Sequence, residues 1–275
     1  MGVMTFFLKH FGALASPPPR TGANVWYFSY GSNMNAKVFC KRRKITAQAI
    51  LPATLPGYVL SFAYDGIPYL EPAFATCCRR DDAAHHNAHA NDDDDTPDVH
   101  GVAFLVTRGE LTRILATEGG LGWGDCGGYR LHEAAAVGYD GRRLTVATLV
   151  GGPVRGPPSL RNRPSARYMR LCVAGAKANN LRKDYVAWLE TRHATYAAPA
   201  AGQPRARRVA AAQFLFNVLS IPLMLVYGVA VPVFTGVLRC QRAPWLVAKG
   251  LWLYTQLLTF VIYPVVLWLC GEPGF

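Results

Sequence analysis

The chain has 275 residues, of which 51% are hydrophobic, 12% are aromatic and only 17% are charged. This composition excludes collagen-like, coiled-coil and wholly disordered proteins, and so few charges argue against a wholly soluble protein. The 29 Lys and Arg residues outnumber the 17 Asp and Glu residues, and the net charge of +12 suits an anionic small molecule, an anionic membrane surface or nucleic acid.

The cysteines favour a reducing compartment. There are seven of them, an odd number, and they are irregularly spaced without a Cys-x-x-Cys pair. A secreted disulfide framework and a zinc ribbon both show regular cysteine spacing, so the pattern disfavours both. We expect most of these cysteines to be small buried hydrophobic residues.

Residues 1–23 are expected to form a flexible N-terminal tail. Their apolar start is interrupted by Lys9, and it lacks the basic beginning and the long apolar run of a secretory signal. Beyond the tail, the pattern predicts a buried strand over 24–30, a short basic helix over 34–43 and a second strand over 57–64.

Residues 79–98 form a low-complexity insertion that contains the run HHNAHANDDDD. Such a polar run cannot bury enough apolar surface to pack, so we expect a disordered surface loop. Metal binding by His85, His86 and His89 is the alternative, but nothing in the surrounding sequence holds these side chains rigidly. The solvated loop is the favoured interpretation.

A strand over 99–107 leads into a helix whose two ends are marked in the sequence. Thr107 and Glu110 have the spacing of a capping box, which predicts that the helix begins directly after Thr107. Apolar residues then recur at helical spacing. The helix is expected to end at Glu118, because the two glycines that follow permit a left-handed exit.

Strands and helices alternate after this helix. Strands are predicted over 128–138 and 143–150, followed by a Gly-, Pro- and Arg-rich loop over 151–164. Two helices come next, with Tyr168 on the apolar face of the first and Tyr185 on that of the second. The arginines in and after the loop are either solvated or form a clamp for carboxylates: Arg155, Arg161, Arg163, Arg167 and Arg170.

The C-terminal part of the chain differs in composition from the rest. Residues 197–208 have the composition of a linker, and the 30 residues of 209–238 and the 22 residues of 250–271 carry no formal charge. A run of about 20 apolar residues is long enough to span a bilayer. We therefore expect a membrane-associated helical hairpin over 209–271, with a buried soluble helix pair as the alternative.

The stretch Tyr27–Met34, with the sequence YFSYGSNM, is the most informative part of the chain. A buried strand here runs into a tight turn, where Gly31 lets the backbone approach a ligand closely. Successive backbone N–H groups, together with the Ser32 and Asn33 side chains, would form a concave site for a carboxylate. An ordinary hairpin turn with a buried tyrosine is the alternative.

This stretch resembles the signature of the γ-glutamylcyclotransferase-like family. Further pieces similar to the family follow in the same order over residues 24–196: Val99–Phe104, Glu118-Gly119, Tyr129-Arg130, Pro164–Tyr168 and Gly175–Leu181. The resemblance implies an α+β fold for 24–196, a partly closed mixed β-barrel with flanking helices, to which the apolar helical hairpin is added.

The resemblance also implies a reaction. In this family the α-amine of a γ-glutamyl group attacks its own γ-carbonyl and releases 5-oxoproline, with no metal or cofactor. Glu118 matches the catalytic acid and base of this lyase reaction. The residues that would bind the small-molecule substrate are Tyr27, Phe28, Ser29, Tyr30, Gly31, Ser32, Asn33, Tyr129 and Tyr168.

Among the members of this family, the chain is similar to the cyclotransferases of fungal clusters that make gliotoxin-type toxins. That similarity implies removal of γ-glutamyl groups from a glutathione conjugate in mycotoxin biosynthesis. The predicted C-terminal hairpin would make the protein membrane-associated, with its catalytic domain in the cytosol. A γ-glutamylamine cyclotransferase and a non-catalytic, membrane-anchored γ-glutamyl binding protein are the alternatives. Nucleic acid is a disfavoured partner, because the KRRK run at 41–44 lacks interleaved aromatic residues and is typical of a solvated helix face.

Overall fold

The structure is a computed structural model. It describes residues 24–67, 71–82, 96–118, 129–151, 163–191 and 206–215, and the single residues 193, 195, 196, 203 and 218. The chain divides into two units, and most described residues belong to the unit formed by 16–67 and 71–197. The predicted tail over 1–23 and most of the predicted hairpin over 209–271 lie outside the described residues. In the part of the chain that is described, no helix is long and apolar enough to cross a membrane.

Five strands close into a barrel in the order β1-β5-β2-β6-β7. Their bounds are β1 Val25–Ser29, β2 Ala49–Leu55, β5 Val99–Val106, β6 Tyr129–Gly138 and β7 Arg143–Gly151. The ladders are antiparallel except for the one between β1 and β7, in which Trp26 lies opposite Val146. This parallel ladder closes the barrel, so the predicted partial closure was wrong on this point.

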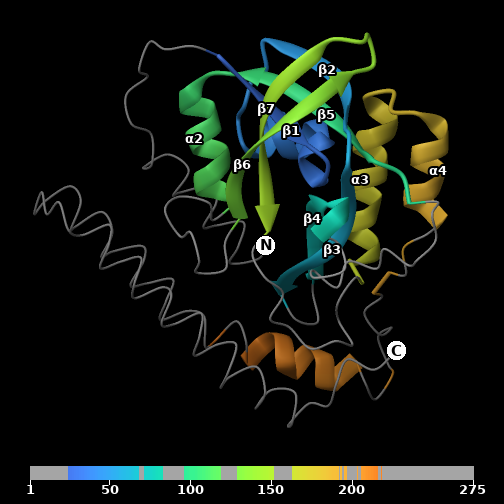
Figure 1. Ribbon diagram of the computed structural model, residues 1–275. Coiled ribbons are helices and arrows are strands. Elements are labelled where there is room, and N and C mark those ends of the chain that lie inside the picture. Colours follow the sequence, from blue (N-terminus) through green and yellow to red (C-terminus); the bar gives the residue numbers. More distant parts are fainter. Residues whose placement is uncertain are drawn as a thin grey trace, which may run out of the picture. The chain divides into compact units, whose positions relative to one another are not determined.

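A two-stranded sheet and three helices accompany the barrel. The sheet consists of β3 (Tyr58–Ile67) and β4 (Glu71–Arg79), and the helices are α2 (Arg108–Thr117), α3 (Ala166–Ala178) and α4 (Lys183–Thr191). Figure 1 shows α2 on one side of the barrel and the pair α3 and α4 on the other. The described residues of this unit also contain the 3₁₀ turns η1 (Ser32–Met34) and η3 (Arg80–Asp82) and the π-helix η2 (Lys37–Arg42).

Most predicted elements of this unit are present, and α2 has the expected capping box between Thr107 and Glu110. Two strands were not predicted, β2 and β4, and each contains a proline, Pro52 and Pro72. Proline weakens the sequence signal of a strand because it removes a ladder donor. The predicted insertion over 79–98 overlaps the end of β4 and η3, and its residues 83–95 lie outside the described part of the chain.

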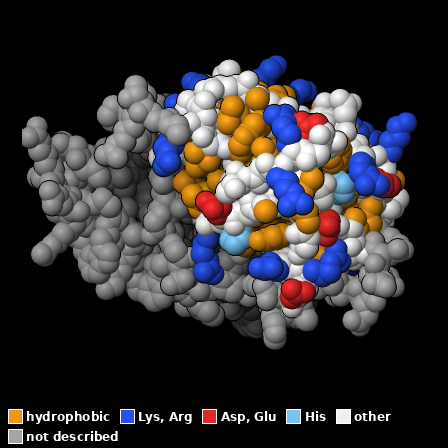
Figure 2. All heavy atoms as spheres, turned by 45° about the horizontal axis from the view of Figure 1, so that its top comes forward, with side chains coloured by type: hydrophobic (Ala, Val, Ile, Leu, Met, Phe, Trp, Pro, Cys, Tyr) orange, Lys and Arg blue, Asp and Glu red, His pale blue; other side chains and the backbone are white. Residues whose placement is uncertain are grey.

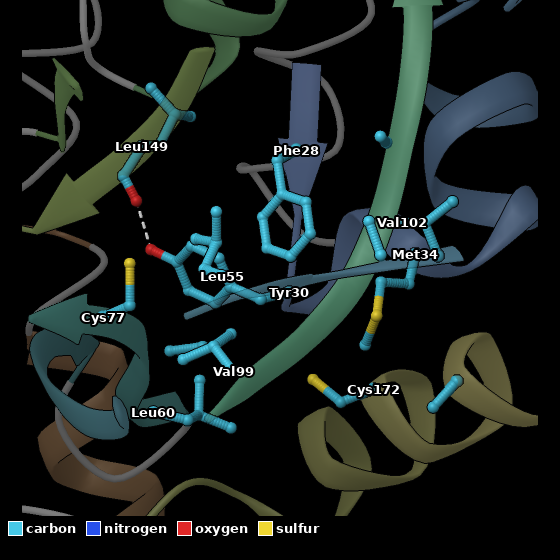
Figure 3. Close-up of a cluster of buried hydrophobic side chains, with 14 of the residues drawn as sticks. Phe28, Tyr30, Met34, Leu55, Leu60, Cys77, Val99, Val102, Leu149 and Cys172 are labelled. Atoms are coloured by element: carbon cyan, nitrogen blue, oxygen red, sulfur yellow. Dashed lines mark hydrogen bonds between the residues drawn. The ribbon is translucent and has the colours of Figure 1, made fainter. Parts of the chain in front are cut away.

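The core forms where β1 meets the neighbouring strands and α3. Phe28 is fully buried there, and Figure 3 shows it near Tyr30, Met34 and Val102. Gly101 makes this packing possible, because a Cβ at that position would lie 2.3 Å from the Ser29 carbonyl oxygen and 2.7 Å from the Phe28 ring. The glycine in the second stretch of the family resemblance is therefore explained by the close approach of β1 and β5.

The cysteines that the structure describes behave mainly as core residues. Cys77, Cys78 and Cys172 are buried, Cys40 is exposed, and all four are free thiols. Burial raises the pKa of both the Cys77 and the Cys172 thiol to about 12. These two thiols therefore remain protonated at neutral pH and act as small apolar side chains.

His193 should make the stability of the protein depend on pH. Its ring packs edge-on against Phe62 and Trp188, at centroid distances of 4.7 Å for both pairs, and burial lowers its pKa to about 4. An unfolded histidine titrates near 6.5, so the unfolded chain binds the proton more tightly. Neutral His193 therefore contributes up to about 3 kcal/mol to the free energy of unfolding. This contribution is complete above about pH 6.5 and is lost as the pH falls to about 4.

Urea unfolding at pH 7 and at pH 4.5 checks this expectation. The wild-type free energy of unfolding should fall between the two pH values, whereas the variant His193→Phe should lose less, because a neutral ring replaces the imidazole. His100, whose pKa is also lowered mainly by burial, should leave a smaller fall in the variant. An identical fall in both proteins would show that His193 is not the titrating group.

Candidate active site

The second half of the predicted signature forms a turn directly after β1. Tyr30 and Gly31 lead into η1, which is closed by a hydrogen bond of 3.0 Å from the Met34 N–H to the Gly31 carbonyl. A Cβ at Gly31 would lie 3.0 Å from the Tyr168 hydroxyl and 3.3 Å from the Ala75 Cβ. Because residue 31 is glycine, the Tyr168 hydroxyl of α3 and Ala75 of β4 can pack closely against the turn.

Asn33 is the centre of a hydrogen-bond network at this turn. It is 5% exposed, and its Nδ2 donates to the Tyr27 hydroxyl at 3.1 Å and to Glu118 Oε1 at 2.8 Å. Its Oδ1 accepts a bond of 2.7 Å from Arg43 Nε. Both ends of the amide are engaged, which fixes the side chain of Asn33 between the strand and the candidate catalytic carboxylate.

Glu118 is positioned by the end of α2. It is the C-cap residue of that helix, and its backbone N–H donates to the Ile114 carbonyl at 3.0 Å. Its side chain is 20% exposed and forms an ion pair with Arg43 through Oε1, the oxygen that also accepts from Asn33. Among the described residues Oε2 has no hydrogen-bond partner. One oxygen of the carboxylate is therefore anchored by two donors, and the other has no partner in the part of the chain that is described.

Three tyrosines contribute protonated hydroxyls close to this carboxylate. Burial raises the pKa of Tyr27, and the negative charge of Glu118 raises it further. Burial is also the main cause of the raised pKa values of Tyr129 and Tyr168, to which Glu118 adds. All three hydroxyls therefore keep their protons at neutral pH and act as neutral hydrogen-bonding groups.

Tyr129 and Tyr168 are joined through β4, one of the two strands that were not predicted. The Tyr129 hydroxyl donates to the Ala75 carbonyl at 2.6 Å, and the Tyr168 hydroxyl accepts from the Ala75 N–H at 3.3 Å. Tyr168 also accepts from the backbone N–H of Ser32. The Ser32 N–H, which we expected to bind the substrate carboxylate, is thus hydrogen-bonded to the Tyr168 oxygen instead.

Three of the predicted substrate-binding residues lie away from Glu118 and support the turn. Phe28 is in the core, and Tyr30 donates its hydroxyl hydrogen to the Leu149 carbonyl, as Figure 3 shows. Ser29 is 3% exposed, and its side chain hydrogen-bonds to Tyr27. Tyr27, Asn33, Tyr129 and Tyr168 remain as the predicted side chains grouped around Glu118, with Gly31 and Ser32 supplying backbone.

Arg43 is a site residue that the sequence reasoning missed. The KRRK run was assigned to a solvated helix face, but the Arg43 side chain is only 10% exposed and pairs with Glu118. The cause is the local backbone: the predicted helix is the π-helix η2, Arg43 is its C-cap, and Lys44 follows with a left-handed φ of 55°. Four consecutive basic residues contain no signal that shows which one turns inward.

The arginines expected to form a carboxylate clamp have different places. Arg167 donates from Nε to the buried Glu71 at 2.6 Å, and the Ser165 hydroxyl donates to the same carboxylate at 2.5 Å. These contacts connect the start of α3 to Glu71 of β4, so Arg167 has a structural partner. Arg155 and Arg161 lie outside the described residues.

No cluster of three or more potential metal ligands occurs in the described ranges. His85, His86 and His89, the residues of the alternative metal interpretation, are not among the residues that the structure describes.

Comparisons with known proteins relate the chain to one group of enzymes. It is 32% identical over 215 residues to the γ-glutamyl cyclotransferase aclK of Aspergillus oryzae, covering 75% of each chain. It is 30% identical over 189 residues to the γ-glutamyl cyclotransferase gliK of Aspergillus fumigatus, covering 66% of each chain. A solved γ-glutamyl cyclotransferase structure matches with a TM-score of 0.50 at 18% identity, over 68% of this chain and 97% of the other. No family model matches.

Proposed function

The chain belongs to the γ-glutamyl cyclotransferase family, and on that premise we propose that it releases 5-oxoproline from the γ-glutamyl group of glutathione or of a glutathione conjugate. The observation that carries the proposal is the state of Glu118, whose Oε1 is anchored by two donors while Oε2 has no partner among the described residues. A general base needs this combination of a fixed orientation and a free oxygen.

The reaction needs one proton carrier and a folded-back substrate. Glu118 Oε2 takes a proton from the α-ammonium group, and the free amine attacks the γ-carbonyl carbon of the same glutamyl unit. A C–N bond forms in the five-membered ring, the original γ C–N bond breaks, and Glu118 gives its proton to the leaving nitrogen. Glu118 then takes the second proton from the ring nitrogen and passes it to the released amine, which becomes an ammonium group, so that Glu118 ends as the carboxylate. Because the nucleophile and the carbonyl belong to one molecule, orientation supplies much of the rate enhancement.

The surrounding donors suit the two charges of the glutamyl unit. The η1 backbone N–H groups are hydrogen-bond donors for the α-carboxylate and for the oxyanion that develops on the γ-carbonyl, and the Tyr129 hydroxyl can join them only when it releases the Ala75 carbonyl. The Tyr168 hydroxyl, which accepts from the Ser32 N–H, must move or share that donor when a carboxylate arrives. A substrate thus replaces an internal hydrogen bond of the turn with one to its own carboxylate.

A glutathione conjugate is the substrate we favour. Relatives such as gliK are fungal γ-glutamyl cyclotransferases, and the family resemblance points to toxin biosynthesis. Most of the surplus of basic residues lies in the first 210 positions, and glutathione carries two carboxylates. On the face in Figure 2, Lys and Arg side chains are spread among apolar ones rather than gathered into a stripe. This distribution suits a small anion better than nucleic acid.

Incubation of the full-length protein with a set of γ-glutamyl compounds tests the proposal. The set contains glutathione, a bulky glutathione S-conjugate, a γ-glutamyl dipeptide and γ-glutamyl-lysine, and 5-oxoproline is quantified by mass spectrometry. We expect release from glutathione or its conjugate, with the higher kcat/KM for the conjugate. Release from γ-glutamyl-lysine alone would identify a γ-glutamylamine cyclotransferase. Tight binding of the compounds without release would identify a binding protein.

A further inference from the structure

We propose that Arg43 is a positioning residue of the cyclotransferase reaction, which fixes Glu118 so that Oε2 alone carries the proton. The inference rests on the proposed function. It adds to the predicted site a residue that lies outside the YFSYGSNM signature and that touches the catalytic carboxylate from a different element, the end of η2.

The contacts of Arg43 form a closed triangle with two site residues. Its Nε donates to Asn33 Oδ1 at 2.7 Å, and its Nη2 donates to Glu118 Oε1. The third side is the bond of 2.8 Å from Asn33 Nδ2 to that same Oε1. Three planar groups joined in a ring cannot rotate independently, so the orientation of the Glu118 carboxylate is set by Arg43 and Asn33 together.

The burial of the triangle makes the charge of Arg43 important. The side chains of Arg43 and Glu118 are 10% and 20% exposed, so little water is available to solvate either charge. A carboxylate in such a place needs a paired cation and satisfied hydrogen bonds. Arg43 supplies both at Oε1, which leaves Oε2 without a partner among the described residues.

Lysine cannot take over this role. The guanidinium uses two different nitrogens to bridge Asn33 and Glu118, and its planar fork holds them in a fixed relation. A lysine ammonium keeps the charge but offers a single nitrogen on a flexible stem. Arg43→Lys therefore separates the geometry of the bridge from its charge.

The neighbouring Arg42 provides a matched control. It is the preceding residue of the same basic run, it is exposed, and its side chain has no hydrogen bond or ion pair among the described residues. Burial of part of its side chain and the adjacent Arg43 charge lower the pKa of Arg42, yet it remains a cation at neutral pH. Arg42→Lys makes the same exchange of arginine for lysine, but at a residue outside the triangle of Arg43, Asn33 and Glu118.

The test compares Arg43→Lys, Arg43→Ala and Arg42→Lys in the full-length protein, with 5-oxoproline release as the measured rate. For Arg43→Lys we expect kcat to fall by about 10²-fold, the size of effect that misplacing a catalytic group produces, with KM changed little. Added guanidinium ions should restore part of the kcat of Arg43→Ala, because they can refill the position of the lost group. Arg42→Lys should match the wild type.

Two outcomes would overturn the inference. One is a kcat for Arg43→Lys equal to that of the wild type. The other is a loss of activity for Arg43→Ala that guanidinium does not relieve and that follows a loss of folded protein in circular dichroism.

A second measurement separates this inference from the proposed function. Urea midpoints of Arg43→Lys, Glu118→Gln and the double variant form a cycle that needs no activity. Changes in urea midpoint that are not additive would show that Arg43 and Glu118 are coupled. If the wild type then releases no 5-oxoproline, the triangle stands and the proposed reaction is rejected. Additive shifts would show that Arg43 and Glu118 are not coupled and would reject the positioning role even in an active enzyme.

Discussion

Replacing Glu118 with Gln is expected to lower kcat for 5-oxoproline release by about 10³-fold, within the range that loss of a general acid–base produces. The amide keeps the size of the side chain and an oxygen that can accept from Asn33, so the substrate should still bind and KM should change little. What the variant loses is the ability of the free oxygen to carry a proton between the two nitrogens. Steady-state kinetics on a glutathione conjugate measures both constants.

The same variant should also destabilise the fold. It leaves the poorly exposed Arg43 cation without its carboxylate partner, and breaking a fully buried pair costs about 3–5 kcal/mol. Because Glu118 is 20% exposed, we expect a smaller loss of about 1–2 kcal/mol. Glu190→Gln is the control, since Glu190 pairs with Lys177 on the surface. A Glu118→Gln enzyme with wild-type kcat would remove Glu118 from the mechanism.

The parts of the site that sequence predicts are those fixed by local backbone chemistry. The Thr107–Glu110 capping box sets the start of α2, and Glu118 is the C-cap of this ten-residue helix, so local signals place Glu118 without any knowledge of distant contacts. The turn at Gly31 is likewise a local feature, because a strand that runs into a glycine must change direction there. Local signals therefore predicted the catalytic candidate and the loop that faces it.

The parts that sequence could not predict depend on distant partners. Arg43 is separated from Glu118 by 75 positions, and its inward direction follows from a π-helix that periodicity does not distinguish from an α-helix. β2 carries Pro52 in its ladder with β5, opposite Val102, although proline lacks a donor. Its carbonyl still accepts from the Tyr139 N–H at 2.9 Å, a contact that only the folded barrel creates. Tertiary pairing overrode the local preference in both cases.

Gly175→Ala is the second substitution from which we expect a large effect, because α3 rests on the active-site turn through bare backbone at this residue. An added Cβ would lie 2.7 Å from both the Asn35 nitrogen and the Met34 carbonyl carbon. Those atoms are backbone and cannot move aside as a flexible side chain would. The Asn179 side chain also ties the two elements together, donating to the Met34 carbonyl at 2.9 Å.

Two opposing effects decide the result for this variant. Alanine favours a helix interior over glycine by about 1 kcal/mol, whereas overpacking a close contact costs about 1–3 kcal/mol. The added Cβ would meet backbone atoms, which cannot move aside, so the cost of overpacking should be near the upper end of that range. We therefore expect a net loss of about 1–2 kcal/mol in the free energy of unfolding. Gly109→Ala in α2 is the control, since its Cβ would meet only the Thr107 hydroxyl oxygen, at 4.0 Å, and it should be neutral or stabilising.

The activity of Gly175→Ala should fall further than its stability, because η1 contains Asn33 and any shift of the turn moves the amide that anchors Glu118 Oε1. A displacement near 1 Å is enough to lower kcat by about 10²-fold. Measuring kcat at a temperature where the variant is still fully folded separates this effect from unfolding. Wild-type kcat in a destabilised Gly175→Ala would mean that the turn tolerates displacement and that Asn33 does not need α3 to hold Glu118.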